Sequence, residues 1–206
     1  MKTFRKIFVL FIGPLIIVGL AYFVINSISQ PVRFNNEFKA REAVAIERLK
    51  DIRTLQVIYK SKFGQFSSSM DSLIDFYHNG QLTIIRQIGS MDDSLAVAQK
   101  RVYRDSVKVA VRDSLFTNRH GFVIDSLRYV PFSGKKEIIV ETAVRQISGI
   151  PVPLFAASAP YIYLLKGMDE QLIINLIAER KDVFKRYEGV RVGSIDAPNN
   201  NAGNWE

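Results

Sequence analysis

The stretch Ile7–Ile28, IFVLFIGPLIIVGLAYFVINSI, sets the organisation of this chain because it contains no charged residue. As a helix with a rise of 1.5 Å per residue it would extend about 33 Å, which matches the ~30 Å hydrocarbon core of a bilayer. The Gly13-Pro14 step would break a soluble helix, but a membrane helix tolerates it because the freed backbone groups find partners within the segment. We therefore expect residues 1–30 to form a cytoplasmic stub and a transmembrane anchor in contact with membrane lipid.

A cleaved secretory signal is the alternative interpretation of the same stretch. Its charged start, its apolar run and the residues Ser27-Ile28-Ser29 follow the general plan of a signal peptide. The apolar region of a signal peptide is typically about 7 to 15 residues long. The longer run found here favours an anchor that is retained.

The charges on either side of the apolar run predict its orientation. Three basic residues precede it within five positions: Lys2, Arg5 and Lys6. Those that follow it, from Arg33 to Arg41, are diluted by Glu37. By the positive-inside rule the N-terminus lies in the cytoplasm and the rest of the chain outside it. We expect a single-pass protein of the inner (cytoplasmic) membrane with its domain in the periplasm.

Composition excludes several function classes. The net charge of +8 comes from 28 basic and 20 acidic residues, and the longest basic clusters are pairs such as Lys135-Lys136 and Arg180-Lys181. Nucleic-acid binders gather basic residues on one face, so no nucleic-acid partner is expected. The chain has no cysteine, which rules out disulfides, thiolate zinc sites and iron–sulfur clusters.

Residues 31–195 carry the patterns of a folded α+β domain. Ser29-Gln30-Pro31 is expected to interrupt the first helix, and a second helix is predicted from Phe34 to Phe63. Its buried stripe would consist of Ala45, Leu49, Ile52, Gln56, Tyr59 and Phe63. A short helix is predicted from Met70 to Tyr77, whereas Gln81–Gln99 fits either a strand or a helix.

Alternating apolar residues predict most of the strands. In Val102–Phe116 the side chains of Val107, Val109 and Val111 would point inward. Further strands are predicted at Leu127–Pro131, Glu137–Ile147, Pro153–Ala157, Tyr161–Leu165 and Val190–Ser194. Between the last two, a helix capped by Asp169 is predicted from Glu170 to Tyr187, with its buried stripe formed by Leu172, Ile173, Leu176, Ile177 and Phe184. The pattern indicates an amphipathic helix packed on a mainly antiparallel sheet.

The sequence lacks the motifs of familiar enzymes. The two histidines, His78 and His120, have no metal-ligand partner three or four residues away. No Gly-x-Ser-x-Gly elbow and no phosphate-binding glycine loop occurs. We therefore expect a protein that is not an enzyme and needs no cofactor. A membrane-anchored enzyme whose carboxylates meet only in the fold, or a ligand-sensing domain, stays open as an alternative.

The polar C-terminal tail, residues 196–206, raises the question of a calcium site. Asp196, Asn199 and Asn201 supply hard oxygen ligands of the kind that calcium prefers. The spacing fits no EF-hand, so a solvated terminus is the alternative. Trp205, the only tryptophan, predicts that the tail packs against the domain, since an indole seldom stays in water.

The order of these parts resembles that of pilin-like proteins, and most closely the major pseudopilins of type II secretion systems. The likeness lies in the N-terminal apolar helix, in the helix end Ile58–Phe66 (IYKSKFGQF) and in the pair Asn204-Trp205 near the terminus. It implies a pilin-like domain that serves as a non-catalytic structural or assembly component of a bacterial envelope complex. Its expected partners are other envelope proteins and, through the N-terminal helix, further copies of itself.

The sequence departs from that family at the start of its helix. A pilin leader ends in glycine just before a helix whose fifth residue is glutamate, whereas Gly13 is followed by Pro14 and the fifth residue is Val18. The prepilin leader motif and the helix glutamate are both missing from this stretch. Leader cleavage is therefore not expected.

Overall fold

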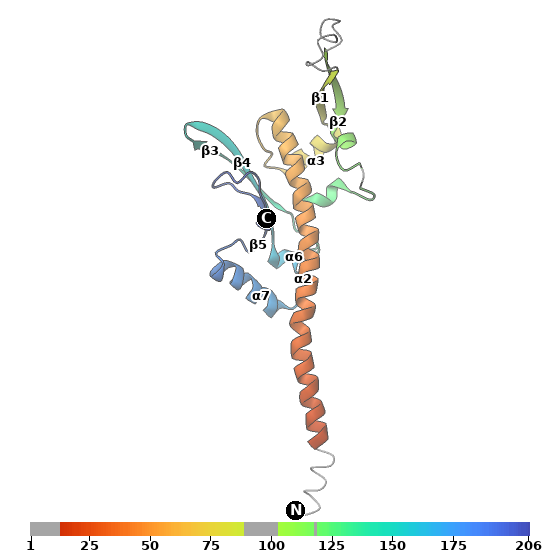
Figure 1. Cartoon of the computed structure of the whole chain (residues 1–206), viewed down its shortest axis with the longest axis vertical. Helices are drawn as coiled ribbons and strands as arrows, with labels where there is room; N and C mark the ends of the chain where they lie inside the picture. The colour runs from red at the N-terminus through yellow and green to blue at the C-terminus, as the bar shows by residue number, and fades with distance from the viewer. Residues whose placement is uncertain (1–12, 89–102, 118) are drawn as a thin grey trace, which may run out of the picture.

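The fold is organised around one long helix (Figure 1). The structure, a computed structural model, describes residues 13–88, 103–117 and 119–206. Helix α2 (Gly13–Phe63) projects below a domain of short helices and antiparallel strands that is built around its upper half. The chain is therefore a mixed helix-and-sheet protein, as predicted.

Helix α2 is continuous over 51 residues and contains Pro31 in its interior. The predicted interruption at Ser29-Gln30-Pro31 is therefore wrong. A proline removes one N–H donor and costs a helix about 3 kcal/mol, which long helical segments on both sides can offset. The hydroxyl of Ser29 donates to the carbonyl of Ile25 at 2.7 Å and adds a bond one turn below the proline.

The lower half of α2 is exposed and apolar. The helix is long and apolar enough to cross a membrane, and the apolar window that meets this criterion is not buried against the domain. Exposed side chains run from Leu15 to Ile28 on every side of the helix. A soluble core helix would bury such a segment. Residues 7–12 of the expected anchor lie outside the described residues.

The upper half of α2 buries the predicted stripe. Ala45, Leu49, Ile52 and Gln56 are buried, and Phe38 and Leu55 extend the same contact surface. The stripe stops short of the predicted end, since Tyr59 is half-buried and Phe63 is 50% exposed. Phe63 is the last residue of the helix, and Gly64 ends it with a φ of 76° and an N–H that bonds Lys60 O at 2.8 Å.

The main sheet has three antiparallel strands in the order β3 (Ile139–Ile147), β4 (Ile150–Pro160) and β5 (Gly189–Gly193). Strands were predicted at all three places, and β4 is longer than expected at both ends. Helix α2 packs on β4 and β5. Phe155 of β4 is fully buried, and its ring lies 4.7 Å from that of Phe66, in the segment that follows α2.

A separate two-stranded ribbon extends from the far end of the domain (Figure 1). Strands β1 (Gln81–Ile88) and β2 (Tyr103–Ala110) pair antiparallel, with Gln81 opposite Ala110. The strand predicted at Val102–Phe116 ends at Ala110, because helix α5 (Val111–Ser114) starts at Val111, which is buried. Val107 was predicted to point inward but is 47% exposed. The rest of the segment that fits either strand or helix lies outside the described residues.

Two predicted strands are helical turns. Leu127–Pro131 overlaps η2 (Ile124–Arg128), followed by a single bridge between Tyr129 and Glu137. Tyr161–Leu165 forms α6 (Tyr161–Leu164), in which the Tyr161 ring packs 5.4 Å from that of Phe38. Both runs are only five residues long, which is too short for their periodicity to separate a strand from a helical turn.

The two remaining helices begin where they were predicted. Helix α3 (Met70–Asn79) extends two residues beyond the expected end. Helix α7 (Glu170–Ala178) starts after Asp169, whose Oδ1 accepts a bond from Leu172 N at 3.0 Å and so caps the helix as expected. It continues as the π turn η3 (Glu179–Val183) and stops short of Tyr187, so Phe184 is 51% exposed instead of buried.

Candidate functional site

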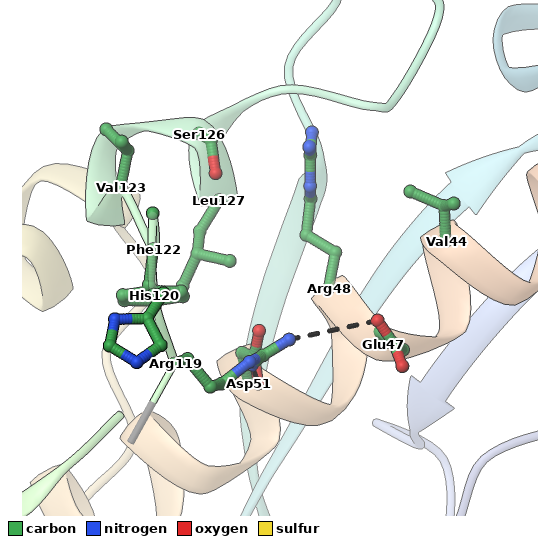
Figure 2. A pocket seen from close by; sticks show the side chains of 11 residues that line it. Val44, Glu47, Arg48, Asp51, Arg119, His120, Phe122, Val123, Ser126 and Leu127 are labelled. Atoms are coloured by element: carbon green, nitrogen blue, oxygen red, sulfur yellow. Dashed lines mark hydrogen bonds and ion pairs between the residues drawn. The ribbon is translucent and has the colours of Figure 1, made fainter. Parts of the chain in front are cut away.

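A groove lies between α2 and the segment Arg119–Leu127 (Figure 2). Its volume is about 230 Å³, and we call it the Asp51 groove. The α2 side contributes Val44, Glu47, Arg48 and Asp51, which share one face of the helix at spacings of three and four residues. The facing segment enters from the end of α5 and leaves through η2.

The charged groups of this groove are paired with each other. Arg119 donates to Asp51 Oδ1 at 2.6 Å, and a second guanidinium nitrogen lies 3.8 Å from Glu47 Oε2 (Figure 2). The same guanidinium lies 5.9 Å from the ring centroid of Phe116 and 5.5 Å from that of Phe122. Arg119 therefore fastens this segment to α2.

Burial shifts the pKa of two α2 groups in this groove, Asp51 and Arg48. The Asp51 side chain is only 12% exposed, and desolvation raises its pKa by more than the bond from Arg119 lowers it. Burial likewise lowers the pKa of Arg48, which donates to the carbonyl of Tyr129. A carboxylate held in this way ties the Arg119 segment to α2.

The two histidines have different surroundings. His120 lines the Asp51 groove, whereas His78 lies in α3 with its ring 5.5 Å from that of Tyr77. In residues 13–88, 103–117 and 119–206, no three His, Cys, Asp or Glu side chains gather as metal ligands would. The groove is open and charged rather than closed and apolar.

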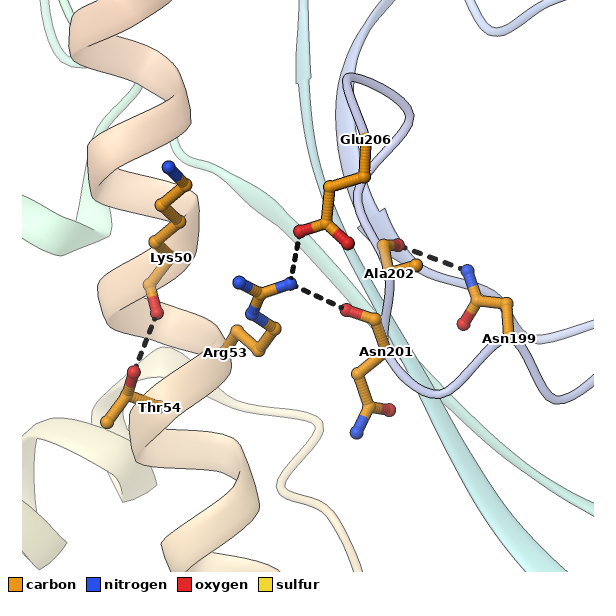
Figure 3. Close-up of polar contacts among 7 residues, drawn as sticks. All are labelled: Lys50, Arg53, Thr54, Asn199, Asn201, Ala202 and Glu206. Atoms are coloured by element: carbon orange, nitrogen blue, oxygen red, sulfur yellow. Dashed lines mark hydrogen bonds and ion pairs between the residues drawn. The ribbon is translucent and has the colours of Figure 1, made fainter.

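The three predicted calcium ligands have separate surroundings in the tail. The Asp196 carboxylate is 79% exposed and lies 3.9 Å from Arg145. The side-chain amide of Asn199 donates to Ala202 O at 3.1 Å, while the main-chain oxygen of Asn201 accepts from Arg53 at 3.3 Å (Figure 3). Arg53 places a positive charge beside one of the expected ligand oxygens, which opposes a cation there. Calcium binding stays a prediction.

The tail itself packs against the domain, as Trp205 predicted. Gly203 forms a bridge with Val192 at the edge of β5, and Asn204 N donates to Arg191 O at 2.9 Å. Trp205 is half-buried against the hydrophobic core. Glu206 accepts a bond from Arg53 of α2 at 2.6 Å, and this guanidinium lowers the pKa of the Glu206 carboxyl (Figure 3).

The two edges of the main sheet differ in a way that matters for partners. The tail covers the β5 edge, whereas in the described part of the chain no strand pairs with the outer edge of β3. The β3–β4 hairpin also exposes apolar side chains, with Val144 63% and Ile150 65% exposed. An open strand edge with exposed apolar residues is a surface to which an extended partner can add.

Several polar contacts join the domain to the middle of α2, between Gln30 and Glu42. Gln30 Nε2 donates to Asp169 Oδ2 at 2.7 Å, and Arg41 donates to Lys166 O at 2.9 Å. The Tyr161 hydroxyl donates to Glu42 at 2.6 Å, and burial raises the pKa of that hydroxyl. Sequence reasoning missed these contacts because each joins residues more than a hundred positions apart, and no local pattern marks them.

Comparison with known proteins identifies no family for this chain. No protein-family model matches the chain, and no curated protein and no solved structure resembles it significantly.

Proposed function

We propose that this protein is a non-catalytic structural or assembly subunit of a bacterial envelope complex, anchored in the inner membrane with its domain in the periplasm. One observation carries the proposal: the two halves of α2 have opposite surroundings. The half from Leu15 to Ile28 is exposed and apolar, and the half from Ala45 to Gln56 is the core of the domain. A bilayer around the first half would remove its apolar surface from water.

The continuity of α2 supports a mechanical role. Anchor and domain share one helix without a break at Pro31, and Gln30 and Arg41 bond the domain on either side of that residue. A domain fixed to its anchor in this way keeps a set position above the membrane. A flexible linker would serve a mobile enzyme or sensor better.

The open β3 edge supplies a contact surface for such a subunit. The exposed Val144 and Ile150 lie on the β3–β4 hairpin, whereas Asp51 and Arg119 of the Asp51 groove are already paired with each other. A surface of this kind favours a protein partner over a small substrate. The resemblance to pseudopilins points the same way and adds self-association through the N-terminal half of α2.

Membrane fractionation and a fusion test the anchor. The full chain, expressed in a bacterium with two membranes, is expected to stay in the membrane pellet after alkaline carbonate, whereas residues 31–206 alone should leave it. A reporter that is active only outside the cytoplasm, fused after Glu206, should be active. A carbonate-soluble full chain or an inactive reporter would reject the anchored, outward-facing arrangement. A mature N-terminus at Gln30 would turn the anchor into a signal peptide.

Site-specific photo-crosslinking tests the partner surface. A photoreactive residue in place of Val144 is expected to capture an envelope protein in cells, and one in place of Val57, an exposed residue of α2, should capture much less. Equal crosslinking at the two positions would show that the β3 edge is not the surface that binds the partner.

A further inference from the structure

We propose that the segment Arg180–Arg186, at the end of α7, rests on the anionic lipid headgroups of the membrane that α2 enters. We call this segment the α7 tip. The inference rests on the proposed anchoring of α2 and adds a second, peripheral contact with the same bilayer.

The contact of Asp169 with Gln30 places the start of α7 close to the end of the apolar run of α2. Gln30, whose side chain bonds Asp169 at 2.7 Å, lies only two residues beyond Ile28, where the apolar run ends. The other oxygen of the same carboxylate caps α7 through Leu172 N. The helix therefore starts at the level where the apolar span ends. Figure 1 shows the start of α7 as the part of the domain nearest the free half of α2, and the helix runs outward and slightly upward from there.

The chemistry of the α7 tip fits a lipid interface. Val183 and Phe184 are consecutive, 71% and 51% exposed, although Phe184 was predicted to be buried. The tip contains four basic residues and one acidic residue, a net charge of +3: Arg180, Lys181, Lys185, Arg186 and Asp182. An exposed apolar pair flanked by lysine and arginine is typical of segments that lie at the boundary of headgroups and acyl chains.

The backbone holds this pair at the end of a closed turn. Arg186 N donates to Arg180 O at 2.9 Å, and Lys185 has a φ of 52°, so the chain reverses just after Phe184. The neighbouring acidic groups are Glu179, Asp182 and Glu188, of which Glu188 lies 3.7 Å from Lys181. They reduce the attraction to anionic lipid without cancelling it. The expected preference for anionic vesicles is therefore modest, about twofold or more.

Lipid-quenching fluorescence tests the contact on the full chain. Since the sequence has no cysteine, each of three single substitutions takes one fluorescent label: Leu20→Cys in the span, Val183→Cys in the α7 tip and Val123→Cys as a control. Val123 is 57% exposed and lines the Asp51 groove, about 25 Å further along α2 than Gln30. The proteins are reconstituted in phosphatidylcholine vesicles with or without phosphatidylglycerol, with a quencher on the lipid.

The three labels separate this inference from the proposed anchoring. We expect quenching of the Leu20→Cys label in both vesicles, about twofold stronger quenching of the Val183→Cys label when phosphatidylglycerol is present, and none of the Val123→Cys label. An unquenched Leu20→Cys label would reject the anchor itself. A quenched Leu20→Cys label with the other two alike would reject only the membrane contact of the α7 tip.

A charge variant tests the role of the headgroups. Lys185→Gln together with Arg186→Gln, in the Val183→Cys background, should remove the preference for phosphatidylglycerol and leave the quenching at Leu20→Cys unchanged. Equal quenching of the unmodified tip in both vesicles would overturn the recognition of anionic lipid.

Discussion

Gln56 bonds both backbone groups of Ser67: its Nε2 donates to the Ser67 carbonyl oxygen at 2.7 Å, and its Oε1 accepts from the Ser67 N–H at 2.9 Å. Gln56 is fully buried, and Ser67 is 6% exposed. Gln56→Leu would leave both Ser67 groups buried without a partner. It is expected to lower the free energy of unfolding by about 2–4 kcal/mol. Denaturant unfolding of the full chain in detergent micelles measures this change.

The matched control is Thr54→Leu, another polar-to-leucine change two residues away on the exposed side of α2. It should change the free energy of unfolding by about 0.5 kcal/mol or less. If both variants unfold like the natural protein, the bond between Gln56 and Ser67 contributes nothing to the fold.

The predicted burial stripe of α2 can be tested by two neighbouring substitutions. Leu49 is fully buried, whereas Lys50 is exposed. Leu49→Asp would bury an unpaired charge and is expected to cost about 4 kcal/mol or more, while Lys50→Asp should stay within about 0.5 kcal/mol. The melting temperatures of the two variants, measured under the same conditions, check this. Equal losses would contradict the assigned face.

The success and failure of sequence reasoning follow from the length of each pattern. The α2 stripe could be predicted because Ala45, Leu49, Ile52 and Gln56 repeat over several turns. Sequence placed Gln56 on the buried face but could not name its partner, since Ser67 follows the end of the helix. The short runs around Leu127 and Tyr161 were assigned to strands because a few buried residues carry no clear period.

The candidate site was less predictable than the fold. The Asp51 groove depends on Arg119, which reaches α2 from 68 positions away. No spacing rule connects two such positions. The same holds for Gln30 and Asp169, where sequence identified the helix cap but not the contact with α2. Pairwise contacts of this kind are fixed only once the surrounding elements have packed.

The pKa of Asp51 predicts how stability depends on pH. Its folded pKa is raised above the ordinary value of 3.8, so the folded chain binds more protons than the unfolded chain between those two values. The contribution of Asp51 to the free energy of unfolding therefore falls as the pH rises from about 3.8 through the raised pKa. Asp51→Asn should lack this fall, which denaturant unfolding at a series of pH values would reveal.

Arg119→Gln tests how much the guanidinium of Arg119 lowers the pKa of Asp51. Loss of the guanidinium removes the bond that lowers the Asp51 pKa, so the fall in stability should extend to higher pH. A contribution from Asp51 that grows as the pH rises would show that the attraction of Arg119 outweighs the cost of burial.

Trp205 reports on the packing of the tail because it is the only tryptophan in the chain. A half-buried indole should emit to the blue of an exposed one and shift red on unfolding. A Cβ at Gly203 would lie 2.4 Å from the Trp205 ring, so Gly203→Ala should displace the indole and shift the native emission red. Gly19→Ala, where the added atom meets open space, is the control and should leave the emission unchanged.

The predicted calcium site can be tested by thermal unfolding, with the emission of Trp205 as the second measurement. If Asp196 and the oxygens of Asn199 and Asn201 converge on a cation, added calcium should raise the melting temperature through its preference for the folded chain, and a chelator should reverse the change. Arg53 bonds the main-chain oxygen of Asn201 and so competes with such a cation. Asp196→Asn should abolish the thermal response without shifting the native emission of Trp205. Blue-shifted emission together with a melting temperature that responds to neither calcium nor chelator would support the packed tail and reject the calcium site.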